Sequence, residues 1–89
     1  MNATETKYII RTTYRLEDGE RVLFVSEGDF GKLGDVDRMG DAAFYSTADD
    51  AAIRAKRYAK HIRENGNGVK ATLDVMAVKL AETPISVSV

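Results

Sequence analysis

The chain has 89 residues, with 13 Lys and Arg, 14 Asp and Glu, no cysteine and a formal net charge of −1. This length makes one domain that buries about 60–65% of its unfolded surface, and the lack of cysteine excludes a disulfide framework, a thiolate nucleophile and a thiolate metal site. The sequence has no apolar run of the ~18 residues that span a bilayer, and residues 1–6 form a polar leader that we expect to be disordered, so we predict a cytoplasmic protein without membrane contact.

Two strands joined by a hairpin are predicted at the start of a single folded domain, which we expect to span residues 7–83. Lys7–Arg15 and Arg21–Ser26 are rich in β-branched and aromatic residues. Between them lies Asp18-Gly19, a dipeptide typical of the type I′ turn that joins antiparallel strands. We therefore predict a β-hairpin with these two residues as its loop.

The turn also predicts which side chains share a face of the sheet. In this register Tyr14 pairs with Leu23 and Thr12 pairs with Val25. We expect a helix to cover this face, which also carries Tyr8 and Ile10. The opposite face carries three large apolar side chains, those of Ile9, Val22 and Phe24.

The least regular segment is Glu27–Asp41, which holds four of the seven glycines and five acidic residues. A connection this long in a small domain is often functional. Two interpretations remain open: its apolar side chains anchor it to the core, or Phe30 or Leu33 at its tip binds a partner. A calcium site formed by Asp35, Asp37 and Asp41 is not favoured, because the fifth position of this acidic loop is Met39, which offers no oxygen ligand, and the twelfth is Ser46 in place of a bidentate glutamate.

An amphipathic helix is predicted from Thr47 to Asn65, after a short third strand at Ala42–Tyr45. Its apolar stripe has the helical period and consists of Ala48, Ala51, Ala52, Ala55, Ala59 and Ile62, with Tyr58 at the edge. Alanine lets a helix approach a flat surface closely, so we expect the stripe to pack on a sheet. Ser46 or Thr47 is the expected N-cap, and Asn65-Gly66 is a strong stop because either residue adopts a left-handed conformation readily.

The last element, Val69–Leu80, has two interpretations. Its β-branched residues favour a strand, although its leucines also fit a helical stripe. Pro84 ends this element, and residues 84–89 are expected to form an edge strand or a tail. The predicted class is α+β: a small antiparallel sheet in the order ββ(β)αβ with one amphipathic helix packed on one face.

The outer face of the predicted helix is basic, and charge is unevenly placed along the chain. Residues 1–50 carry 6 Lys and Arg against 11 Asp and Glu, and residues 51–89 carry 7 against 3, which gives −5 and +4. The basic face consists of Arg54, Lys56, Arg57, Lys60 and Arg63. Such a face is ordinary on a helix exposed to solvent. It also suits an acidic protein partner. A nucleic acid fits less well, because the sequence has neither a stacking platform nor a known binding motif. We take as candidate partner-binding residues Phe30, Leu33, Arg54, Arg57 and Lys60.

No constellation of residues indicates catalysis. His61 is the only histidine, and it lies on the polar side of the helix near arginines rather than near a carboxylate that would orient it. The glycines of the irregular loop lack the Lys-Ser/Thr of a phosphate-binding loop. We therefore predict a protein that is not an enzyme and uses no cofactor and no metal.

A homodimer is predicted from the sheet face that the helix leaves open. One helix shields a strip of roughly 10 Å, so it covers only one face of the sheet. Ile9, Val22 and Phe24 on the other face form an apolar patch, which we take as a candidate dimer interface. Two covers compete with a second copy: the segment after Pro84, and the Glu27–Asp41 loop.

The order of the elements resembles a known group of proteins. The pattern K-Y-x-I at Lys7–Ile10 and a hairpin precede the pattern A-x-x-Y-S-x-x-x-D-A at Ala42–Ala51, which opens the basic helix. In this order most of the chain resembles small phage- and prophage-encoded accessory proteins of unknown function. The resemblance implies a protein that acts by binding a host or phage component, for example to inhibit a defence or regulatory protein, and it carries over no functional residue. We therefore predict a non-enzymatic protein-interaction module, which as a phage accessory protein would bind or inhibit a host protein. The alternative is a nucleic-acid-binding accessory protein that uses the basic helix face.

Overall fold

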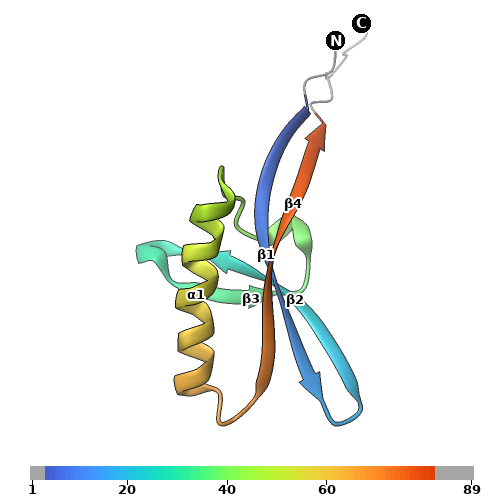
Figure 1. Ribbon diagram of the computed structural model, residues 1–89, viewed down its shortest axis with the longest axis vertical. Helices are drawn as coiled ribbons and strands as arrows, with labels where there is room; N and C mark the ends of the chain where they lie inside the picture. The colour runs from blue at the N-terminus through green and yellow to red at the C-terminus, as the bar shows by residue number, and fades with distance from the viewer. Residues whose placement is uncertain (1–3, 82–89) are drawn as a thin grey trace, which may run out of the picture.

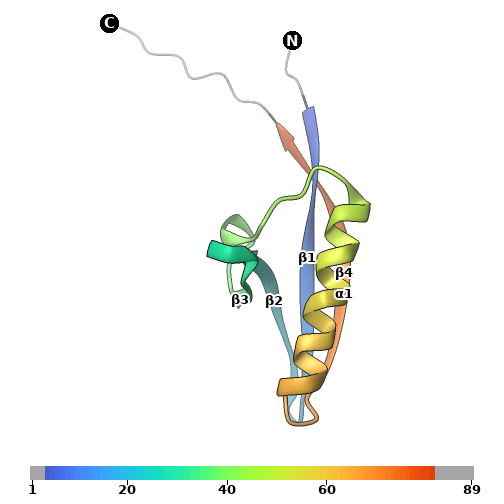
Figure 2. The same ribbon diagram turned by 90° about the vertical axis from the view of Figure 1, so that its left-hand side faces the viewer.

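The computed structural model describes residues 4–81 and contains one antiparallel sheet and one helix (Figure 1). The elements are β1 (Thr4–Leu16), β2 (Gly19–Glu27), the 3-10 turn η1 (Asp29–Gly31), β3 (Leu33–Val36), the 3-10 turn η2 (Met39–Asp41), α1 (Ala48–Asn65) and β4 (Lys70–Ala81). The strand order in the sheet is β3-β2-β1-β4. Figure 2 shows α1 lying in front of β1 and β4. The α+β class, the helix on one face and the strand rather than helix at β4 are confirmed.

The hairpin between β1 and β2 has a different register from the predicted one. Thr12 lies opposite Leu23, and Leu16 opposite Gly19, so the loop is Glu17-Asp18 rather than Asp18-Gly19. Gly19 begins β2 with a φ of 145°, which L side chains rarely adopt, so the glycine is needed in the strand rather than in the loop. The shift is two residues along the partner strand, so every side chain stays on its predicted face.

The third strand lies inside the segment that was predicted to be irregular. β3 pairs with β2 through Leu33–Val36. The predicted strand at Ala42–Tyr45 is wrong, since this segment contributes an isolated bridge in which Tyr45 and Tyr8 exchange two backbone hydrogen bonds of 2.8 Å. The bridge forms there because β2 pairs with β1 only from Arg11 onward, which leaves a position beside Tyr8 for the connection to α1.

β1 and β4 form the longest pairing, from Thr4 opposite Ala81 to Arg15 opposite Lys70. The prediction of a disordered leader over residues 1–6 is therefore wrong for Thr4–Thr6, because these residues find backbone partners in β4. The rest of that leader, and the edge strand or tail predicted at 84–89, lie outside the described residues.

α1 packs its alanine stripe on β1 and β4. Ala51, Ala55 and Tyr58 are buried in a core that also contains Ile10 and Val25. The first alanine of the predicted stripe, in the first turn of the helix, is exposed instead. The face of β1 and β2 that alternation predicted to be covered is thus the face that packs against the helix.

Both ends of α1 have identifiable causes. Thr47 is the N-cap, and its Oγ1 accepts a hydrogen bond of 3.1 Å from the backbone N–H of Asp50. At the other end, a Cβ on Gly66 would lie 2.5 Å from the carbonyl oxygen of Ile62, so the residue must be glycine because of space. The left-handed conformation occurs two residues later than the predicted stop, at Asn67 with φ 52° and at the glycine after it.

Candidate functional site

The loop that contains η1 presents a fully exposed aromatic side chain. This teal segment lies beyond α1 on the left of Figure 1. Phe30 has a relative exposure of 107% and a left-handed backbone, with φ 60° and ψ 23°, and Gly31 after it has φ 72°. A left-handed conformation costs a residue with a Cβ roughly 1–2 kcal/mol. The Phe30 side chain gains no burial that would offset this cost. The position is therefore a candidate for function rather than for packing.

Hydrogen bonds hold the loop in this shape. The N–H of Gly28 donates to the carbonyl of Lys32 over 2.8 Å, and the N–H of Gly31 donates to the carbonyl of Gly28 over 3.2 Å. From α1, the guanidinium of Arg57 donates to the carbonyl of Gly31 over 2.9 Å. The loop is therefore closed on itself and tied to the helix at the residue after Phe30.

Glu27, at the end of β2, joins the base of this loop to the basic face of α1. Its Oε1 accepts hydrogen bonds from the Tyr45 hydroxyl at 3.2 Å and from Arg54 Nε at 3.3 Å, and it lies 3.8 Å from Arg57 Nη2. Arg54 also lies 3.5 Å from Asp50 and over the ring of Tyr45. Burial, and then the Glu27 carboxylate, raises the pKa of Tyr45 to about 12. Arg54 and Arg57 thus act first as contacts that position the loop.

A second polar cluster fixes β3 under the helix. The hydroxyls of Tyr14 and Tyr58 both donate to Oδ2 of Asp35, the latter over 2.9 Å. Burial, and then this carboxylate, raises the pKa of Tyr14 and raises that of Tyr58 to about 12. The cluster ties β1, β3 and α1 together and so supports the strand that follows the loop. Sequence reasoning considered Asp35 only as a calcium ligand, and no local pattern links residues this far apart.

The structure brings two of the predicted partner-binding residues, Leu33 and Arg57, together beside the loop that carries Phe30, and Arg54 contacts the base of this loop through Glu27. A shallow hollow beside the loop is lined by Gly31, Lys32, Leu33, Arg57, Tyr58 and His61. Leu33 packs partly buried against the core rather than at the tip. Lys60 lies 3.9 Å from Glu64 in an exposed i,i+4 pair, which contributes little. We call the exposed residues at this place, Phe30, Lys32, Arg57 and His61, the Phe30 surface.

The candidate dimer-interface residues fall on the sheet face away from α1, as alternation predicts. Val22 is 47% exposed and Phe24 is half-buried, but Ile9 is fully buried at 0% within the single chain. Ile9 is therefore wrong as an exposed interface residue. It lies in an inner strand, directly opposite Met76 on one side, while Tyr45 pairs with its neighbour on the other side.

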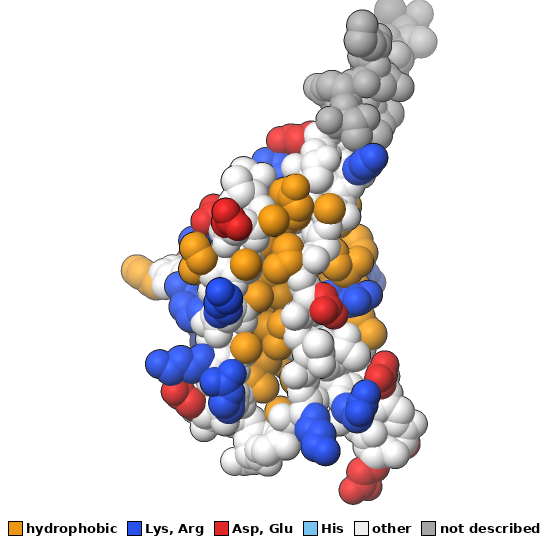
Figure 3. Space-filling view, viewed as in Figure 1, with side chains coloured by type: hydrophobic (Ala, Val, Ile, Leu, Met, Phe, Trp, Pro, Cys, Tyr) orange, Lys and Arg blue, Asp and Glu red, His pale blue; other side chains and the backbone are white. Residues whose placement is uncertain are grey.

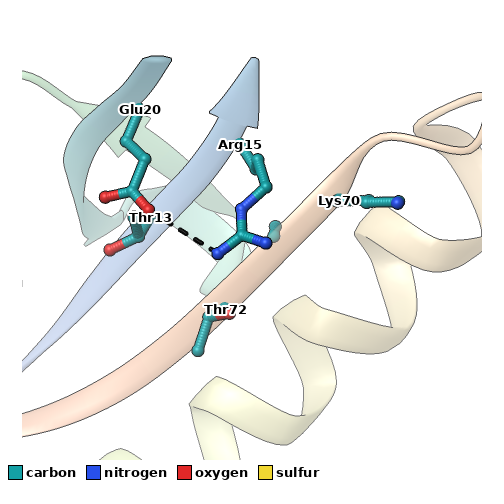
Figure 4. Close-up of a pocket in the computed structure, with 6 residues that line it drawn as sticks. Thr13, Arg15, Glu20, Lys70 and Thr72 are labelled. Carbon is teal, nitrogen blue, oxygen red and sulfur yellow. Dashed lines mark ion pairs between the residues drawn. The ribbon is translucent and has the colours of Figure 1, made fainter. Parts of the chain in front are cut away.

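The same face carries a small polar depression near the hairpin. Figure 4 shows Thr13, Arg15, Glu20 and Thr72 around it, with Lys70 directed away from the ion pair. Arg15 Nη2 and Glu20 Oε1 are 3.8 Å apart, and both side chains are more than half exposed. Because its charged groups are solvated and do not converge on one point, we assign no ligand to this depression.

Within residues 4–81, no group of three or more His, Asp or Glu side chains is placed to hold a metal ion. The helix that the structure describes there is not long and apolar enough to cross a membrane.

Comparison of the chain with protein-family models, with curated proteins and with solved structures finds no match. The resemblance to phage accessory proteins, the cytoplasmic location and the absence of enzymatic activity therefore stay predictions.

Proposed function

We propose that this protein is a non-enzymatic protein-interaction module that binds its partner through the Phe30 surface. The observation that carries the proposal is Phe30 itself: a fully exposed phenyl ring, on a left-handed backbone, in a loop held by Arg57. Moving such a ring from water into a partner's pocket contributes about 1.5–3 kcal/mol. This is the size of a typical energetic centre of a protein interface.

The way the loop is held favours tight binding. A loop that already has its bound conformation loses little conformational entropy on association. The hydrogen bonds within residues 28–32 and the contact from Arg57 restrict the loop before any partner is present. The exposed side chains of Lys32 and Arg57 beside Phe30 suit a partner whose apolar pocket has an acidic rim.

The resemblance to phage accessory proteins adds a class of partner. On that basis we propose that the pocket belongs to a host-cell protein, which the module binds and inhibits. The nucleic-acid alternative has less support, since Arg54 contacts Glu27 and Asp50 and Lys60 lies beside Glu64, so these cations of the helix face are partly neutralised.

The test compares capture of host proteins by the wild type and by Phe30→Ser. Leu16→Ser is the matched control, because Leu16 is also an exposed large apolar residue but lies at the hairpin end of β1. We expect one specific partner to be retained by the wild type and by Leu16→Ser and lost by Phe30→Ser. If the wild type and both variants retain the partner, Phe30 is not part of the interface. Salt-sensitive binding of a DNA duplex that survives Phe30→Ser would support the nucleic-acid alternative instead.

A further inference from the structure

β4 is an edge of the sheet, and it is long and regular. Within residues 4–81 it pairs with β1 alone, in a register that runs without interruption from Lys70 to Ala81. One row of its backbone N–H and C=O groups therefore faces outward in the described part of the chain. Such a row is a template for pairing with another strand.

The features that usually protect an edge strand are few here. Edge strands are commonly short, or carry proline, bulges or charged side chains, lysine above all. β4 has 12 residues, more than the usual range of about 3–10, and contains neither proline nor a break in its register. The charged residues of β4 are Lys70, Asp74 and Lys79, which leave its centre, Val75–Val78, free of charge. Val75 and Leu80 are 36% and 38% exposed.

An apolar column runs beside this edge. Figure 3 looks onto the β4 side of the molecule and shows hydrophobic side chains in a column between α1 and β4, bordered by charged side chains. Part of it is a shallow groove whose apolar lining is Ala59, Ile62, Val69, Ala71 and Leu73. Apolar side chains at the centre and charges at the rim are the usual layout of a protein interface.

We propose that a second copy of this chain occupies this surface, pairing β4 with β4 edge to edge and antiparallel about a two-fold axis. The lengths of the strands favour this occupant: the other edge, β3, has only four residues, whereas a second β4 matches the first along its whole length. The two sheets then continue into each other with both helices on the same face. The two apolar columns meet at the axis and cover each other.

The area of this contact is adequate for a stable dimer. A strand of 12 residues is about 40 Å long, and the sheet edge with its helix layer is about 15–20 Å deep. The contact therefore covers about 600–800 Å² on each copy, near the ~800 Å² per partner of a standard interface.

The charges of β4 also permit self-pairing. With the two-fold axis at Met76, Asp74 of one copy lies opposite Val78 of the other. In the same register Lys79 lies opposite Leu73. Like charges directly opposite each other destabilise antiparallel pairs. In this register no two like charges of the described residues face each other.

This interface differs from the predicted one on the open sheet face, so two substitutions separate them. Val75→Lys places charges near the axis, and Phe24→Asp places a charge on the open face. The oligomeric state of the wild type and of each variant is measured by sedimentation equilibrium at tens of micromolar. Circular dichroism is the control for folding. We expect a wild-type dimer, a dissociation constant raised at least roughly tenfold by Val75→Lys, and no change with Phe24→Asp. A monomeric wild type overturns the proposal, as does a dimer that Phe24→Asp dissociates and Val75→Lys does not.

Cross-linking keeps the proposal testable if Val75→Lys fails to fold. The chain has no cysteine, so a single introduced cysteine reports only on its own copy in a second chain. Met76→Cys at the axis should form a disulfide-linked dimer under mild oxidation, whereas Thr72→Cys should not, because the two copies of position 72 lie about 27 Å apart along the strands. No cross-linking above the Thr72→Cys level would overturn the proposal.

Discussion

Replacing Phe30 by glycine should stabilise the protein while it removes partner binding. The side chain is fully exposed, so its loss forfeits no burial, and the φ of 60° is one that glycine adopts freely. Relief of the left-handed conformation gains about 1–2 kcal/mol, and the greater freedom of glycine in the unfolded chain offsets about 0.4–1 kcal/mol of this. The expected change in the free energy of unfolding is therefore an increase of about 0–1.5 kcal/mol.

The assay is urea denaturation at one fixed protein concentration, with Phe30→Ala as the matched control. Alanine keeps a Cβ on the left-handed backbone, so this variant should unfold within about 0.5 kcal/mol of the wild type. Both variants should lose partner binding, because neither carries the ring. If Phe30→Ala were less stable than the wild type by 1 kcal/mol or more, the ring would pack in the folded state and the reasoning for the Phe30 surface would fail.

Two further predictions concern the core and its tyrosines. Ala55→Leu should lower the free energy of unfolding by about 1–3 kcal/mol, because Ala55 is buried between α1 and the sheet, whereas Ala48→Leu at an exposed position should change it little; equal midpoints for the two variants would contradict the packing. The pKa values of Tyr45 and Tyr58 are raised from 10 to about 12 in the folded protein, so their protonated forms stabilise the fold fully below pH 10, and this stability is lost as the pH rises toward 12. Urea midpoints should therefore fall between about pH 10 and about pH 12, and less steeply in Tyr58→Phe; an identical fall in the variant would exclude Tyr58 as a cause.

Local patterns in the sequence predicted the elements that depend on neighbouring residues. The helix follows from the period of its alanines, from the Thr47 cap and from the glycine after Asn65, all of which act within a few residues. The faces of β1 and β2 follow from alternation, which survives the two-residue error in register because side chains alternate with a period of two. Phe30 was also named from the sequence, as an apolar residue in a glycine-rich loop.

The candidate site as a whole was beyond sequence reasoning because its contacts join distant segments. Arg57 reaches Gly31 across 26 residues, and Tyr58 reaches Asp35 across 23, distances at which periodicity carries no information. The basic face was predicted as a binding surface, yet Arg54 faces Glu27. Whether a charged side chain binds a partner or its own chain depends on which segments the fold brings together.

The sequence by itself determined the α+β class, the helix and the alternation of the strands, because hydrophobic periodicity and capping act over one or two turns of chain. Only the tertiary structure decided the order of the strands. Pairing β1 with both β2 and β4 places β4 at the edge of the sheet, and in this arrangement Ile9 is buried within the single chain. That edge, rather than the open sheet face, is the surface on which we propose the dimer. Strand order depends on contacts between residues far apart in the chain, and these form only when the helix and the sheet share one core.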